Sequence, residues 1–138
     1  MAFRPFSEGT GVKSKSVLVV DDDEQMLGLV EHWLEDAGYE VVACSRFEAA
    51  RDYLLAHPPD ALVTDVRLGA YNGLQLALRA SRTAPGTAVL VMSAYDDIVS
   101  RRDAAAFGGR FMLKPFDREL LLNELSEASA TSAASAAV

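Results

Sequence analysis

The chain has 138 residues, of which 50% are hydrophobic and 24% are charged, a composition typical of one globular domain with an ordinary core. Its formal net charge of −7 argues against a nucleic-acid-binding surface on this domain, and its single cysteine, Cys44, excludes an internal disulfide. No apolar run approaches the roughly 18–20 residues of a membrane span, and the first residues lack the apolar core of a signal peptide, so we expect a cytoplasmic protein without membrane contact.

The first part of the chain alternates short apolar runs with helical patterns. Residues 16–20 (SVLVV) predict a buried strand, and residues 23–38 place hydrophobic side chains at helical spacing until a glycine ends the helix. Residues 39–45 (YEVVACS) predict a second strand. Residues 47–57 predict a second helix, which a pair of prolines terminates.

The same alternation continues through the middle of the chain. Residues 61–66 (ALVTDV) predict a third strand and residues 72–82 a third helix. Residues 87–94 (TAVLVMSA) predict a fourth strand, and residues 96–108 a fourth helix of weaker propensity. The strands are almost continuous apolar runs, which is typical of a sheet covered on both faces.

The last part of the chain completes the pattern. Residues 110–113 (RFML) predict a fifth strand, and residues 117–128 a fifth helix with Asp117 at its N-cap. We therefore divide the chain into three segments: a flexible lead-in of residues 1–15, a domain of residues 16–127, and an Ala/Ser-rich tail or linker of residues 128–138.

Five strands alternating with five helices predict an α/β fold with a doubly wound parallel sheet. Ligands of such folds bind beyond the carboxyl ends of the strands. The polar residues at these ends are Asp21 and Asp22 after the first strand, Asp65 at the end of the third, Ser93 at the end of the fourth, and Lys114 after the fifth. Neighbouring carboxylates repel each other unless a positive charge lies between them, so the sequence predicts a divalent cation at this edge.

The motifs at these strand ends resemble the receiver domains of two-component response regulators. They are VLVVDDDE (17–24), ALVTDVRL (61–68), VLVMSAYDD (89–97) and FMLKPFD (111–117). The resemblance covers about residues 16–127 in the family's order. It implies a flavodoxin-like fold with strand order 2-1-3-4-5, in a bacterial signalling phosphoprotein.

The resemblance also implies a phosphoacceptor and a metal site. Asp65 corresponds to the phosphoacceptor aspartate. Asp21 and Asp22 correspond to the acidic pair that binds Mg²⁺ or Mn²⁺, together with Asp65 and the backbone carbonyl of Arg67. The chemistry agrees, because Mg²⁺ prefers oxygen ligands in octahedral geometry.

Further residues correspond to the part of the family that responds to phosphorylation. Ser93 matches the switch hydroxyl and Lys114 the lysine that contacts the phosphoryl group, followed by a proline that is usually cis in the family. Phe111 matches the aromatic switch position. Arg67 and Tyr95 follow Asp65 and Ser93 by two residues, and we expect both to flank the phosphoryl group and to slow its hydrolysis.

We therefore expect Asp65 to take a phosphoryl group from a histidine kinase or a phosphotransfer protein. The domain would catalyse its own phosphorylation and dephosphorylation without turning over a small molecule, and it would change conformation to control an output. The family uses the fourth helix, fifth strand and fifth helix to dimerise. A phosphorylation-dependent homodimer is therefore expected through residues 96–128.

Two alternatives stay open. A pseudo-receiver would act only as an interaction module, although the complete set of aspartates, serine and lysine argues against it. A flavodoxin-like or haloacid dehalogenase-like enzyme would be a different class. The nucleophile of a dehalogenase follows the first strand in a DxD pattern, which Asp21 and Asp23 satisfy formally, whereas a glycine-rich phosphate loop is missing.

One segment departs from the family. After the acceptor the family often has a Met-Pro-x-Met-Asp-Gly pattern, whereas this chain reads RLGAYNG, with Gly69 for the proline and Asn72 for the aspartate. Glycine permits more backbone conformations than proline, so this segment is expected to be a more mobile loop.

Overall fold

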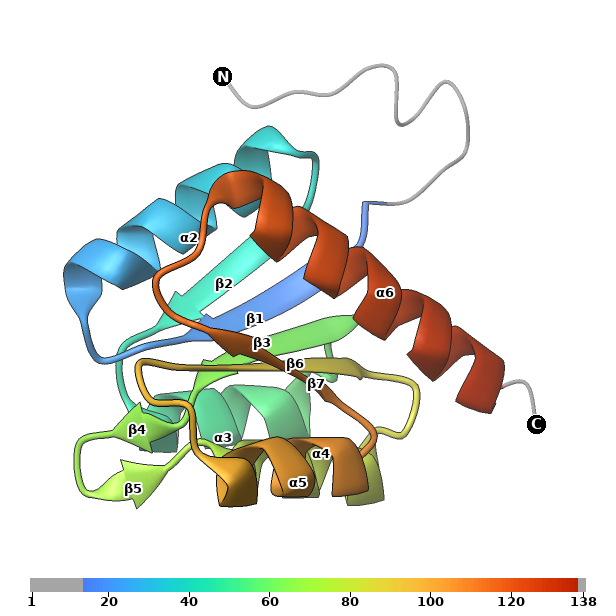
Figure 1. Cartoon of the computed structure of the whole chain (residues 1–138). Helices are drawn as coiled ribbons and strands as arrows, with labels where there is room; N and C mark the ends of the chain where they lie inside the picture. Colours follow the sequence, from blue (N-terminus) through green and yellow to red (C-terminus); the bar gives the residue numbers. More distant parts are fainter. Residues whose placement is uncertain (1–13, 137–138) are drawn as a thin grey trace, which may run out of the picture.

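Parallel strands form the central sheet of the computed structural model, which describes residues 14–136 (Figure 1). The strands of this sheet are β1 (Ser16–Val20), β2 (Glu40–Cys44), β3 (Ala61–Asp65), β6 (Ala88–Ser93) and β7 (Arg110–Leu113). Their order is β2-β1-β3-β6-β7, and every neighbouring pair is parallel. This is the predicted order of 2-1-3-4-5, which is confirmed. Residues 1–13 of the predicted lead-in (residues 1–15) lie outside the described residues.

Helices cover both faces of the sheet (Figure 1). Helices α2 (Glu24–Asp36) and α6 (Arg118–Ala136) lie on one face, and α3 (Phe47–Ala56), α4 (Leu74–Thr83) and α5 (Ile98–Ala106) lie on the other. The five predicted helices are therefore confirmed, in the doubly wound arrangement that the sequence predicts. None of the helices within residues 14–136 combines the length and the apolar character needed to cross a membrane.

The alternation of side chains along β1 divides the core into two layers. Val17 and Val19 pack with α2 and α6, whereas Leu18 and Val20 pack with the helices of the opposite face. All four side chains are buried, because a strand between two helical layers has no exposed face.

Aspartates begin three of the helices. The Asp23 carboxylate accepts hydrogen bonds from the backbone N–H groups of Gln25 and Met26, at 3.1 and 3.2 Å. Asp97 accepts one from the N–H of Val99, and Asp117 accepts one at the start of α6. The predicted N-cap at Asp117 is confirmed. Each carboxylate satisfies an N–H group that has no partner inside the helix.

A small hairpin follows the third strand where the sequence predicted only a loop. Strands β4 (Arg67–Leu68) and β5 (Tyr71–Asn72) pair antiparallel across a two-residue turn. Gly69 begins this turn with a φ of +60°, a conformation that favours glycine. Strands of two residues are too short to produce a readable alternation of side chains, which explains why the sequence pattern missed them.

Helix α6 continues beyond the predicted end of the domain. The prediction ended the helix at residue 128 and the domain at residue 127, whereas α6 runs to Ala136. Ala128 and Ser132 are buried, and the Ser132 hydroxyl donates a hydrogen bond to the carbonyl oxygen of Gly86 at 2.9 Å. The predicted helix end is therefore too early, because small residues that favour helix also fit closely against the sheet. The domain boundary at residue 127 stays a prediction. The linker role of the tail stays a prediction.

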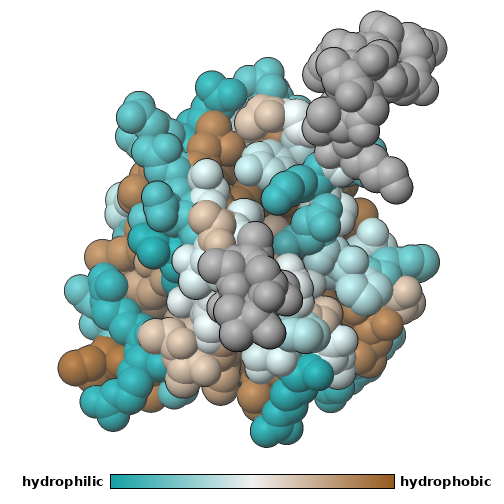
Figure 2. All heavy atoms as spheres, turned by 90° about the vertical axis from the view of Figure 1, so that its right-hand side faces the viewer, coloured by the Kyte–Doolittle hydropathy of each residue, from teal (hydrophilic) through white to brown (hydrophobic). Residues whose placement is uncertain are grey.

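The edge of the molecule where the strands begin lies away from the predicted site. Figure 2 looks at this edge, where hydrophilic and hydrophobic side chains are mixed. The carboxyl ends of the strands lie on the opposite side, next to the β4–β5 hairpin (Figure 1).

Candidate functional site

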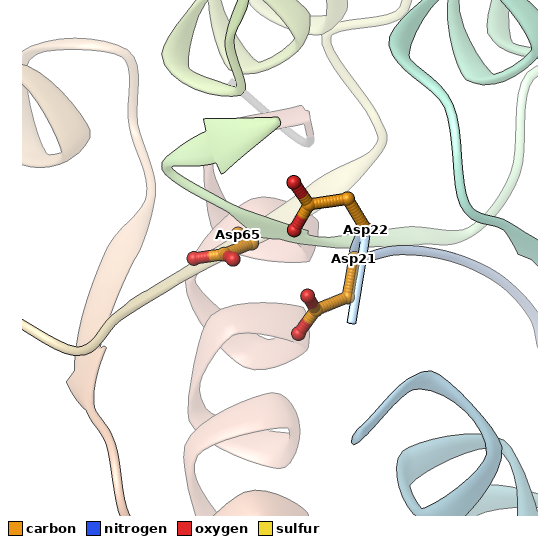
Figure 3. Close-up of side chains that lie close together, drawn as sticks. All are labelled: Asp21, Asp22 and Asp65. Carbon is orange, nitrogen blue, oxygen red and sulfur yellow. The ribbon is translucent and has the colours of Figure 1, made fainter. Parts of the chain in front are cut away.

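Three aspartates meet at the carboxyl ends of β1 and β3. Asp21 and Asp22 follow β1, and Asp65 ends β3, its neighbour in the sheet. Each offers a carboxylate oxygen within 4.8 Å of the others, and Figure 3 shows the three side chains close together, with Asp21 and Asp22 extending toward Asp65. Asp21 is fully buried, Asp65 is 8% exposed, and Asp22 is exposed. The predicted cluster is therefore present, with one edge open to solvent.

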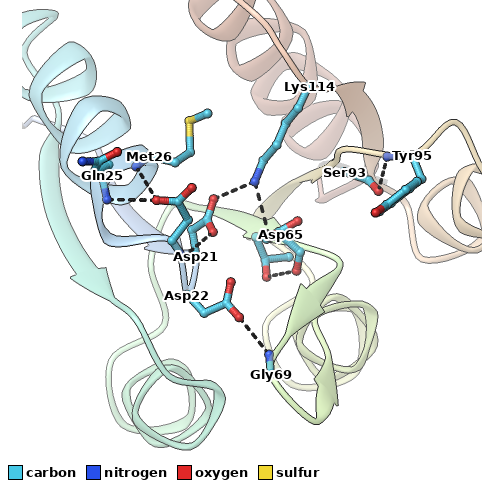
Figure 4. A network of polar contacts seen from close by, with 11 residues as sticks. Asp21, Asp22, Gln25, Met26, Asp65, Gly69, Ser93, Tyr95 and Lys114 are labelled. Carbon is cyan, nitrogen blue, oxygen red and sulfur yellow. Dashed lines mark hydrogen bonds and ion pairs between the residues drawn. The ribbon is translucent and has the colours of Figure 1, made fainter.

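Lys114 reaches into this cluster from the end of β7 (Figure 4). Its Nζ lies 2.8 Å from Oδ2 of Asp21 and 3.3 Å from Oδ2 of Asp65. Its backbone N–H donates to the carbonyl oxygen of Ser93, which fixes the lysine beside the neighbouring strand. The peptide bond between Lys114 and Pro115 is cis, as the resemblance implied. Three carboxylates thus face one ammonium group.

The environment changes the acid–base properties of Asp65 and Lys114. Burial raises the pKa of Asp65 to about 6; the charge of Asp21 raises it as well, and the nearby ammonium of Lys114 only partly offsets both. Burial lowers the pKa of Lys114, but its hydrogen bond to Asp21 and the charges of both aspartates outweigh this effect and raise it. Lys114 therefore stays charged at neutral pH, while the cluster favours additional positive charge.

Backbone contacts fix the orientation of the first two aspartates. Oδ1 of Asp21 accepts a hydrogen bond from the N–H of Asp23 at 3.0 Å. Oδ2 of Asp22 accepts one from the N–H of Gly69 in the hairpin, also at 3.0 Å. Asp23 itself caps α2 and is exposed, which is an ordinary structural role and gives no support to a nucleophile in a DxD pattern.

Ser93 lies close to Asp65, the predicted acceptor, at the same edge of the sheet. It ends β6, whose Met92 pairs with Asp65, and its side chain is buried. The Ser93 hydroxyl accepts a hydrogen bond from the N–H of Tyr95 at 3.1 Å (Figure 4). The strand ends thus bring together the predicted acceptor, acidic pair, hydroxyl and lysine.

The remaining predicted residues are Arg67, Tyr95 and Phe111. The Arg67 guanidinium lies over the Tyr95 ring, 4.4 Å from its centroid. Phe111 pairs with Val91, two residues before the strand ends, so it is not part of the carboxylate cluster. It packs against the core beneath α3, α4 and α5, and the Arg101 guanidinium lies 4.5 Å from its ring centroid.

The sequence pattern did not single out Gly73, which lies against the backbone of Asp65. A Cβ atom at this position would overlap the carbonyl oxygen of Asp65 and lie 2.6 Å from Oγ1 of Thr64. The N–H of Gly73 also donates to the carbonyl oxygen of Val66 at 2.7 Å. Only glycine allows this close approach. The Asn-Gly pair, which is typical of turns, was the available signal, but the predicted helix of residues 72–82 included both residues, whereas α4 begins at Leu74.

Comparison with known proteins defines the class of this chain. The family model "Response regulator receiver domain" matches residues 17–126. The chain therefore belongs to the receiver domain family of response regulators.

Individual relatives agree with this class. The transcriptional regulatory protein YxdJ of Bacillus subtilis is 30% identical over 112 residues, which cover 79% of this chain and 48% of YxdJ. The chain spans about half the length of the curated relatives that head the comparison.

Solved structures share the fold. A CheY-like receiver domain from Methanospirillum hungatei superposes with a TM-score of 0.82 at 22% identity, over 89% of this chain and 99% of that domain. A response regulator from Burkholderia pseudomallei, solved with a phosphorylated aspartic acid, a calcium ion and citrate, is 29% identical with a TM-score of 0.77. That match covers 89% of this chain and 74% of the other. The predicted receiver family and flavodoxin-like fold are confirmed.

Proposed function

We propose that this domain accepts a phosphoryl group on Asp65 from a histidine kinase or a phosphotransfer protein. The observation that carries the proposal is the arrangement of three aspartates within 4.8 Å of one another, with Lys114 against two of them, in a chain of the receiver family. We assign Asp65 as the acceptor because it lies beside Asp21, Lys114 and the β6 strand end and, unlike the fully buried Asp21, is accessible to solvent.

The donor atoms suit a hard divalent cation. The cluster offers carboxylate oxygens and neither sulfur nor imidazole, which favours Mg²⁺ or Mn²⁺. Asp21, Asp22, Asp65 and the backbone carbonyl of Arg67 would hold the ion. When bound, it would supply positive charge for the phosphoryl oxygens.

The transfer step follows from the groups around Asp65. A carboxylate oxygen of Asp65 bonds to phosphorus while the P–N bond of the donor phosphohistidine breaks. The imidazole, protonated on its other nitrogen, leaves as the neutral ring. Lys114, at 3.3 Å from Asp65, neutralises charge on the transferred group, and the Ser93 hydroxyl donates to one of its oxygens.

The switch begins with a change of partner at Ser93. Its hydroxyl accepts from the Tyr95 N–H in the described structure, and a phosphoryl group on Asp65 would attract it. Movement of the loop that follows Ser93 (residues 94–97) would leave room for Phe111 to turn inward. The surface of α5, β7 and α6 would then change, which is where we place the homodimer contact.

A phosphorylation experiment tests the assignment. With Mg²⁺ and acetyl phosphate, the domain should gain one acid-stable, base-labile phosphate, measured by intact mass and located on Asp65. Asp65→Asn should block this gain. Asp23→Asn, which removes the exposed helix cap, should not. Equal labelling of both variants would contradict the assignment, and failure of the wild-type chain to take phosphate would favour the pseudo-receiver.

A further inference from the structure

Two aromatic rings join the β4–β5 hairpin to helix α3. The rings of Tyr71 and Phe47 are stacked, with centroids 4.7 Å apart and planes inclined by 8°. Phe47 is the first residue of α3 and is buried in the core, whereas Tyr71 lies on β5 and is 44% exposed. Stacked pairs contribute beyond their buried area, so this contact attaches the hairpin to a fixed part of the fold.

The hairpin needs such an attachment. Its strands have two residues each, and two short strands alone are not stable in water. Leu68 of β4 is buried in the core, and the Gly69 N–H donates to Asp22 on the side of the carboxylate cluster. On the side of α3, the Tyr71 ring attaches the hairpin to Phe47. The hairpin is thus held between a predicted metal ligand and the hydrophobic core.

The register links the ring to the predicted metal site. Tyr71 pairs with Leu68, and the next pair is Asn72 with Arg67, whose carbonyl is the proposed fourth protein ligand. A shift of Tyr71 would therefore move Arg67 and Gly69 together. The Asp22 carboxylate would have two binding partners, the Gly69 N–H and the proposed cation. The stack keeps the hairpin in place independently of Asp22.

We propose that Tyr71 is a positioning residue for the cation at the phosphoacceptor site. Stacked on Phe47, it holds the hairpin so that the Arg67 carbonyl and Asp22 are arranged before the cation binds. A ligand set arranged in advance binds more tightly, because less order has to be imposed on binding. This inference rests on the proposed function, since it concerns the same metal-dependent site.

Three variants separate stacking from general stability. Tyr71→Ala removes the ring, Tyr71→Phe keeps it without the hydroxyl, and Leu55→Ala removes an equally exposed side chain from α3. Mg²⁺ affinity is measured by calorimetry, and the initial rate of phosphorylation by acetyl phosphate is measured against Mg²⁺ concentration. Unfolding temperatures in EDTA give the change in stability without metal.

We expect Tyr71→Ala to raise the Kd for Mg²⁺ by about three- to tenfold, the range expected for loss of an aromatic stack. Its phosphorylation rate at saturating Mg²⁺ should stay within about twofold of wild type. Tyr71→Phe and Leu55→Ala should bind Mg²⁺ as the wild type does. If Tyr71→Ala does not fold, Tyr71→Leu takes its place, since it keeps an apolar side chain but has no ring face.

Several results would overturn the inference. The variant without the ring (Tyr71→Ala, or Tyr71→Leu in its place) is called the ringless variant. A Mg²⁺ affinity equal to that of the wild type in this variant would do so. An equal loss of Mg²⁺ affinity in Tyr71→Phe or Leu55→Ala would do so as well. If the wild type takes phosphate on Asp65 while the ringless variant is unchanged, only the positioning role is wrong. If the wild type neither binds Mg²⁺ nor takes phosphate on Asp65, the proposed function fails and the inference fails with it.

Discussion

The guanidinium of Arg67 lies against the ring of Tyr95, with its central carbon 4.4 Å from the ring centroid. Arg67 belongs to the hairpin after Asp65, and Tyr95 follows Ser93 at the end of β6. The two residues that the sequence placed beside the phosphoryl group therefore contact each other. A cation–π contact of this kind is worth about 0.5–1 kcal/mol at an exposed site.

This contact predicts a slow loss of phosphate from Asp65. Water must approach the phosphorus in line with the bond that breaks, and the pair would cover that path. Tyr95→Ala and Arg67→Ala should each speed dephosphorylation by about two- to fivefold, the factor that corresponds to one such contact. The double variant should lose phosphate fastest. Its rate increase should nevertheless be smaller than the product of the two single increases, because either single change already removes the contact.

The decay of phosphorylated protein after removal of the donor checks this prediction. Arg102→Ala serves as the control, since Arg102 is an exposed arginine on the neighbouring helix α5. Unchanged or slower decay in both Tyr95→Ala and Arg67→Ala would reject the shielding role.

The sequence predicted the members of the carboxylate cluster because chain order and parallel topology determine which strand ends meet. Asp21 and Asp65 follow from this rule. The rule does not give distances, so it could not show that Lys114 lies nearer to Asp21, at 2.8 Å, than to Asp65, at 3.3 Å. That difference depends on how the lysine side chain packs, which no local pattern encodes.

The features that the sequence missed depend on contacts between distant parts of the chain. The stack of Tyr71 on Phe47 joins two segments whose own patterns predict only a loop and a helix. The close approach at Gly73 depends on the path of the backbone behind Asp65. The end of α6 is different, because an Ala/Ser-rich composition fits both a helix and a linker.

A second prediction concerns pH and metal. The pKa of Asp65 is raised to about 6 in the folded chain, mainly by burial, and an unfolded aspartate titrates near 4. The unfolded chain therefore releases this proton first as pH rises. In EDTA, the contribution of Asp65 to the free energy of unfolding is favourable below about pH 4 and is lost as pH rises through about 6.

Asp65→Asn should therefore be more stable than the wild type at pH 7 in EDTA, by on the order of 1–2 kcal/mol, and the difference should shrink toward pH 4. Mg²⁺ should raise the unfolding temperature of the wild type at pH 7 and less so at pH 5, because the proton competes with the cation. Thermal unfolding across this pH range measures both effects. Asp52→Asn, at an exposed aspartate on α3, should match the wild type both in its stability in EDTA and in its response to Mg²⁺. A wild-type stability without Mg²⁺ dependence at pH 7 would contradict the metal site.

A third prediction separates phosphorylation from the response to it. Ser93→Ala removes the hydroxyl that would contact the phosphoryl group, but leaves Asp65, Lys114 and the carboxylates in place. Phosphorylation should persist. The shift toward the active conformation should weaken by about ten- to hundredfold, since a hydrogen bond to a charged acceptor contributes roughly 1.5–3 kcal/mol.

Trp33 provides a reporter for this response. Its ring lies 6.4 Å from that of Phe116, which follows Lys114 and Pro115. We expect a smaller change of tryptophan fluorescence in Ser93→Ala than in the wild type at equal phosphorylation, and recovery in Ser93→Thr, which keeps the hydroxyl. A full fluorescence response in Ser93→Ala would show that Ser93 has no part in the switch.

The last prediction concerns the surface that carries the signal. Ile98 and Val99 at the start of α5 are 70% and 56% exposed, and Leu113 on β7 is 36% exposed. Leu113 pairs with Ser93 in the sheet, and Ile98 begins the helix that follows the loop after Ser93, so a change at Ser93 reaches these apolar side chains over a short path. Phosphorylated protein, or protein with beryllofluoride, should contain more dimer than the free form in analytical ultracentrifugation. Ile98→Glu should abolish this increase without affecting phosphorylation, because a charge at the centre of an apolar contact is costly to bury. Leu55→Glu, on the exposed side of α3, should dimerise as the wild type does. If the free and activated forms sediment alike at high concentration, the domain does not signal through this homodimer.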